Sequence, residues 1–140
     1  MKNNPLNAYR ETKIKTAGQA KLIVMLYDEA IKQIDLAQSY LEDNSKALDQ
    51  VNNAVGKAQD CITELMASLN FEKGGELAQN LFNLYMFFNQ QLMQGNIDKD
   101  TEPMKLVKGH LNELREAWIE ADKKLKSNGG SSSGGVNIAG

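Results

Sequence analysis

The stretch from residue 48 to residue 69, LDQVNNAVGKAQDCITELMASL, indicates the fold more clearly than any other part of the chain. Its apolar residues recur at an alternating spacing of three and four, at Leu48, Val51, Val55, Ala58, Ile62, Leu65 and Leu69. This spacing places them along one face of an α-helix that must be buried against other elements. With Ser45 as the candidate N-cap, the pattern predicts a helix that continues to about Asn70.

The same kind of spacing predicts a helix on either side of this one. The first begins near residues 16–19 and ends near Asp43. After a turn at residues 70–75, a further helix is predicted with Glu76 in its first turn and a stop at Gly95-Asn96. Its expected core face consists of Leu77, Leu81, Leu84, Phe88 and Leu92.

A fourth helix is predicted in the last third of the chain. Asp98 or Asp100 caps it, Pro103 lies in its first turn, where proline is tolerated, and it ends near Ser127. The only other proline is Pro5, so the long stretch between the two prolines lacks this helix breaker. Four helices with short connections predict an all-α, antiparallel, up-down-up-down four-helix bundle with a short N-terminal arm or helix.

The chain of 140 residues is long enough for one domain with a real core. We expect residues 1–18 to form the N-terminal arm and residues 19–127 to form the bundle. Residues 128–140 are rich in glycine and serine, a composition typical of a flexible tail.

Composition excludes several classes of partner. The 16 basic and 18 acidic residues give a net charge of -2 without a basic block, so no nucleic-acid binding is expected. The longest strongly apolar run, residues 22–27, is far shorter than the roughly 20 residues of a membrane span, so no membrane insertion is expected. The polar start of the chain lacks an apolar signal-peptide core, and the single cysteine favours a reducing compartment. We therefore expect a cytoplasmic protein.

Nothing in the sequence indicates catalysis. Cys61 lies beside an apolar helix face and is interpreted as a small buried residue rather than a nucleophile. His110, the only histidine, is interpreted as a residue at the edge of the core. A di-iron bundle site would need Glu-x-x-His on two helices, and position 107 is a valine. We expect no enzyme activity, no metal and no cofactor.

Two apolar stretches exceed what one helix face requires. Residues 22–27 and residues 84–88 are apolar all round the helix, which calls for burial on two sides. One interpretation is a wide core that covers them. The other is a surface that accepts an amphipathic partner helix, for which methionine is well suited. The candidate binding residues are Met25, Phe82, Met86, Phe87 and Met93.

Several segments together resemble one known family, the flagellar secretion chaperone FliS. Residues 16–31, TAGQAKLIVMLYDEAI, resemble the opening helix of that family. Further matches follow in the family's order: Lys57-Ala58, KGGELA at residues 73–78 with Asn80-Leu81 and Leu84-Tyr85 after it, and Ala117-Trp118. The resemblance covers about residues 5–126. Glu29 departs from it, since the family often has glycine there, and so does Gly95, where alanine is common.

The resemblance implies a function. Members of the family bind the C-terminal segment of newly made flagellin in the cytoplasm, prevent its premature polymerisation and bring it to the flagellar export gate. It implies a 1:1 complex with that segment, and a contact between the arm residues Leu6 and Tyr9 and the export gate protein. For Tyr9, an equally weighted interpretation is that it only fastens the arm to the bundle. The alternative function is a self-associating structural or signalling adaptor.

Overall fold

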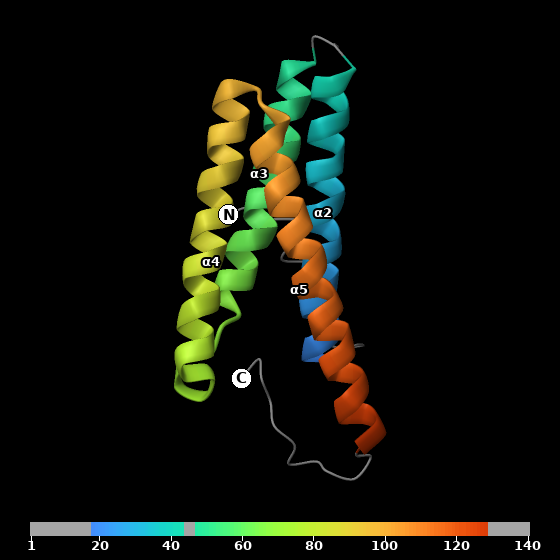
Figure 1. Ribbon diagram of the computed structural model, residues 1–140, viewed down its shortest axis with the longest axis vertical. Helices are drawn as coiled ribbons and strands as arrows, with labels where there is room; N and C mark the ends of the chain where they lie inside the picture. Colours follow the sequence, from blue (N-terminus) through green and yellow to red (C-terminus); the bar gives the residue numbers. More distant parts are fainter. Residues whose placement is uncertain (1–17, 44–46, 129–140) are drawn as a thin grey trace, which may run out of the picture.

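The computed structural model describes residues 18–43 and 47–128, and within these ranges all regular structure is helical. The four helices are α2 (Gln19–Glu42), α3 (Leu48–Ala67), α4 (Phe71–Asp98) and α5 (Thr101–Asn128) (Figure 1). The predicted all-α four-helix bundle is thereby confirmed. The predictions for Leu6, Tyr9 and the Gly/Ser tail lie outside the described residues. The prediction that Ser45 is the N-cap of α3 was wrong, because the helix begins at Leu48 and its N-cap residue is Ala47.

Successive helices run in opposite directions, α2 and α4 one way and α3 and α5 the other (Figure 1). Helix α2 packs against α3 and α5, and α4 packs against the same two helices. The four helices therefore form a closed ring in which α2 lies diagonally opposite α4. This is the up-down-up-down topology that short connections favour.

The core follows the alternating spacing of the sequence. On α3, Val51, Val55, Ala58, Ile62 and Leu65 are all at most 2% exposed, whereas Leu48, predicted on the same buried face, is 48% exposed. Helix α4 contributes Tyr85, Phe88 and Leu92, and α5 contributes Met104, Val107 and Leu111. Burial of these apolar side chains is the main source of stability, at roughly 25 cal/mol per Å² removed from water.

One hydrogen bond crosses the core between the diagonal helices. The hydroxyl oxygens of Tyr27 on α2 and Tyr85 on α4 lie 2.5 Å apart, and both residues are at most 1% exposed. Burial raises the pKa of both hydroxyls, so both phenols stay neutral at physiological pH. The bond satisfies two polar groups that would be costly to bury unpaired, and thus fixes how α2 faces α4.

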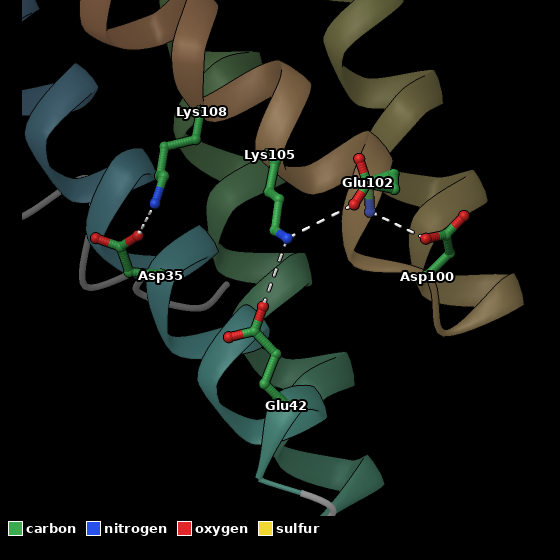
Figure 2. Close-up of polar contacts among 6 residues, drawn as sticks. All are labelled: Asp35, Glu42, Asp100, Glu102, Lys105 and Lys108. Atoms are coloured by element: carbon green, nitrogen blue, oxygen red, sulfur yellow. Dashed lines mark hydrogen bonds and ion pairs between the residues drawn. The ribbon is translucent and has the colours of Figure 1, made fainter.

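Ion pairs close the seam between α2 and α5. Asp28 pairs with Arg115, and Asp35 accepts a hydrogen bond from the ammonium of Lys108 at 2.7 Å. Glu42 lies 3.8 Å from the ammonium of Lys105. Figure 2 shows the last two pairs, which join the two helices side by side. Exposed pairs of this kind contribute at most about 1 kcal/mol each, so their main effect is to align the helices.

The start of α4 differs from the prediction. The helix already begins at Phe71, where the side chain of Asn70 accepts a hydrogen bond from the backbone N–H of Lys73 at 3.0 Å. In place of the predicted turn, the helix has a kink at Gly75. Its φ of 51° and ψ of -125° are accessible to glycine because glycine has no Cβ. Leu77, predicted to lie in the core, is 48% exposed, although it still lines a small pocket with Leu81, Tyr85 and Trp118.

The prediction that this helix stops at Gly95-Asn96 was also wrong. The helix continues to Asp98 and ends at Lys99, whose φ is 52°. Gly95 is instead needed for a close approach, since a Cβ there would lie 3.0 Å from the backbone oxygen of Asp100 and 3.4 Å from Cγ of Met104. Of the two predicted caps, Asp100 accepts a hydrogen bond from the N–H of Glu102 at 3.0 Å.

Candidate functional site

Three of the predicted binding residues lie open on α4. Met86, Phe87 and Met93 are 45%, 38% and 49% exposed. Phe82 on the same helix and Met25 on α2 are half-buried. The wide-core interpretation therefore fails for the three exposed side chains, which no described part of the chain covers.

A continuous row of side chains runs along α4, and we name it the α4 stripe. Its members follow one another at spacings of four, three, four and four residues, so they lie on one side of the helix: Phe82, Met86, Asn89, Met93 and Ile97. Ile97, which the sequence analysis did not single out, is 65% exposed. The stripe borders α3, because the amide of Asn89 faces the hydroxyl of Thr63 and the backbone oxygen of Asn89 accepts a hydrogen bond from Gln59.

Phe87 does not belong to this stripe. A step of one residue rotates a side chain by about 100° around the helix, so Phe87 leaves α4 in a different direction from Met86. The ring of Phe87 lies 6.3 Å from that of Phe88, which stacks in turn on His110 of α5 at 5.7 Å. Met86 and Phe87 were both predicted to bind a partner helix, and they lie on different sides of α4.

Met25 belongs to a second surface. With Val24 it lines an apolar pocket of about 240 Å³ between the first turns of α2 and the last turns of α5. The pocket is formed by Ala20, Lys21, Val24, Met25, Ile119, Asp122 and Lys123. Because α2 and α5 form one side of the ring and the α4 stripe borders α3, the two surfaces lie on opposite sides of the bundle.

Residues 22–27 and residues 84–88, the two stretches that are apolar all round their helices, are thus buried to different degrees. In residues 22–27, only Val24 and Met25 remain half-buried, and the other four side chains are at most 2% exposed. In residues 84–88, Met86 and Phe87 remain open to solvent. The exposed apolar surface is therefore concentrated on α4, with a smaller pocket beside α2.

A charge pattern that the sequence analysis missed marks the same helix. From Leu77 to Ile97 the chain has no Asp, Glu, Lys or Arg, although such residues make up 24% of the whole sequence. The polar residues of this stretch are almost all amides, such as Gln79, Asn83 and Gln90. Depletion of charge at the centre is typical of surfaces that bind other proteins.

The residues considered for catalysis lie in ordinary structural environments. Cys61 is 1% exposed, and burial, with a smaller effect of nearby carboxylates, raises the pKa of its thiol to about 12. A thiol held in the protonated form is a poor nucleophile. His110 lies at the edge of the core, as predicted, with its ring on Phe88. Residues 18–43 and 47–128 contain no group of three or more acidic, histidine or cysteine side chains placed to hold a metal ion.

The raised pKa of Cys61 predicts how stability depends on pH. An unfolded thiol ionises near pH 9, whereas the folded one stays protonated up to about pH 12. The folded state therefore binds more protons in this window, and stability is lost as pH rises, by about 1.4 kcal/mol in total between pH 8 and pH 10 from this group. Urea unfolding followed by circular dichroism at pH 8, 9 and 10 measures the loss. In the Cys61→Ala variant the unfolding free energy should decline less steeply with pH. Equal slopes in both proteins would show that the Cys61 thiol does not cause the loss.

Comparison with known proteins identifies the family of this chain. The family model described as flagellar protein FliS matches residues 2–125. The flagellar secretion chaperone FliS of Bacillus subtilis strain 168 is 33% identical over 118 residues, which cover 84% of this chain and 86% of the relative. The FliS of Salmonella typhimurium is 34% identical over 115 residues, covering 81% of this chain and 84% of the relative.

A third relative, the FliS of Escherichia coli K12, is 30% identical over 112 residues, covering 79% of this chain and 81% of the relative. The protein is thus a flagellar export chaperone by class. The chain belongs to the FliS family of flagellar secretion chaperones. The resemblance seen in the sequence is confirmed, and in the described ranges no helix is long and apolar enough to span a membrane.

Proposed function

We propose that this chaperone binds the C-terminal segment of newly made flagellin in the cytoplasm, in a 1:1 complex. It thereby prevents premature polymerisation, and it delivers the subunit to the flagellar export gate. It acts by binding alone, without a cofactor and without catalysing a reaction. The observation that supports this proposal is the α4 stripe, an exposed apolar row on a helix without charged residues between positions 77 and 97.

The chemistry of the stripe suits an amphipathic helix. Phe82, Met86, Met93 and Ile97 offer apolar contacts on one side of α4, where a partner helix lies along the border with α3. Methionine side chains adapt their shape to such a partner. Covering this surface contributes roughly 25 cal/mol per Å² of apolar area, less the cost of ordering a client that was disordered before.

The second surface extends the proposed contact around the bundle. The pocket lined by Val24, Met25 and Ile119 lies on the other side of the ring from the α4 stripe. No single straight helix can occupy both. A client that uses both surfaces must therefore pass around the bundle, as a segment that is disordered when free can do.

The arm has a separate proposed role. Leu6 and Tyr9 are three residues apart, so a short helix would present both on one side. We assign this pair to the contact with the export gate protein. Their assignment rests on the sequence and the family resemblance, because both residues lie outside the described ranges.

Calorimetry tests the central proposal. The full chain should bind a peptide of the flagellin C-terminal segment with a stoichiometry of one and a negative heat-capacity change, because apolar surface is buried. Flagellin truncated to remove this segment should not bind. A chain that binds neither would overturn the proposal, and a stable dimer in sedimentation that ignores the peptide would instead support the self-associating adaptor.

A further inference from the structure

One member of the α4 stripe is polar. Asn89 occupies the middle of five positions, with Phe82 and Met86 on one side of it and Met93 and Ile97 on the other. An apolar residue at position 89 would make the row continuously apolar. The amide therefore interrupts the surface at the place where a partner helix would be most completely covered.

The amide of Asn89 is poorly paired within the bundle. Its Oδ1 is shielded from solvent and accepts no hydrogen bond from a described residue. Its Nδ2 lies 3.5 Å from Oγ1 of Thr63, a long contact for a hydrogen bond. Buried amides are normally paired, and leaving one unpaired is costly. Because the two ends of an amide have nearly the same shape, a rotation of the side chain would present either the oxygen or the nitrogen to a partner.

The surroundings restrict the chemistry of that partner group. On the α3 side Asn89 contacts the side chains of Gln59 and Thr63, and on α4 the next residue is Gln90. None of these carries a charge. A charged side chain brought here by a client would lose its water without meeting an opposite charge, which is unfavourable. A neutral amide or hydroxyl group would meet donors and acceptors of its own kind.

We infer that Asn89 is a specificity-determining residue that sets the register of the flagellin segment on the α4 stripe, by pairing with an uncharged polar side chain of that segment. This inference rests on the proposed function. A single asparagine within an apolar helix seam fixes register in coiled coils by the same physics. A client shifted by one turn would place its polar residue against Met86 or Met93 and leave Asn89 facing an apolar group.

A substitution matrix tests the inference. Each Asn, Gln, Ser and Thr of the flagellin C-terminal peptide is replaced singly by leucine, and every peptide is titrated against the natural chain and the Asn89→Leu variant. One peptide should bind the natural chain about 10-fold more weakly, because Asn89 is left unpaired. The same peptide should regain that affinity with Asn89→Leu, whereas the unsubstituted peptide should lose about 10-fold with this variant.

Controls separate the possible failures. Asn53→Leu places the same change on an exposed position of α3 and should shift no peptide more than about twofold. Circular dichroism establishes that Asn89→Leu is folded, and Asn89→Ser, which keeps a hydroxyl, should retain part of the discrimination. If the natural chain binds the unsubstituted peptide but the matrix shows no peptide coupled to position 89, the register inference is wrong. If the natural chain does not bind that peptide at all, the proposed function itself fails.

Discussion

Replacing Met86 and Met93 together by glutamate is expected to weaken binding of the flagellin C-terminal peptide by about a hundredfold or more, while the chain stays folded. Both side chains are nearly half exposed, so the bundle tolerates charge there while it is free. In the complex the client would cover two carboxylates. No basic residue lies between positions 77 and 97 to pair with them. Calorimetry gives the affinity, and thermal unfolding shows that stability changes little.

Two matched variants make this result interpretable. Met86→Leu with Met93→Leu keeps the row apolar, and we expect its affinity to stay within about threefold of the natural chain. Leu36→Glu adds a carboxylate at a residue of α2 that is 37% exposed and lies outside both binding surfaces. It should leave binding unchanged. If the double glutamate variant binds the peptide as well as the natural chain does, the α4 stripe is not part of the site.

The bundle could be predicted because its helices depend on a repeated pattern. In α3, the spacing of Val51, Val55, Ala58 and Ile62 fixes which side is buried, and their exposure of 2% or less agrees with it. The burial of a whole helix face does not depend on any single residue. The packing of α3 against α2 and α4 therefore stabilises the helix that its apolar periodicity already favours.

Positions that depend on one backbone angle or one close contact could not be predicted in this way. The positive φ of Gly75 places a kink inside α4 where the sequence predicted a turn before the helix. A glycine pair in the sequence favours a turn, and only the surrounding structure shows that the turn is reduced to a kink. Gly95 likewise resembles a helix stop, whereas its function is to let Asp100 and Met104 approach.

Three of the five candidate binding residues are exposed, and their distribution over different surfaces was predicted only in part. Met86 and Met93 share the α4 stripe, whereas Phe87 and Met25 lie on other surfaces, because exposure depends on which neighbours each helix has. The spacing that joins Ile97 to the stripe was present in the sequence and could have been found there. So could the absence of charge between residues 77 and 97, which separates α4 from the other three helices.

Phe87 and Phe88 provide the sharpest separation of folding from binding, because they are identical neighbours with opposite environments. Phe88 is 0% exposed and packs against Tyr85 and His110, whereas Phe87 is 38% exposed. Phe88→Ala should cost about 3–5 kcal/mol of unfolding free energy, since it removes a large buried ring and leaves a cavity. The midpoint of thermal unfolding should fall by roughly 10–20 °C.

Phe87→Ala is the internal control, and it should cost less than about 1 kcal/mol because much of the ring is already in water. Urea unfolding of both variants under identical conditions gives the two free energies. Any loss of peptide affinity in Phe87→Ala then reports on contact with the client, because its fold is intact. Similar destabilisation by both substitutions would show that the ring of Phe87 is part of the core, and the exposed surface of the chaperone would then be limited to the α4 stripe and the pocket beside Met25.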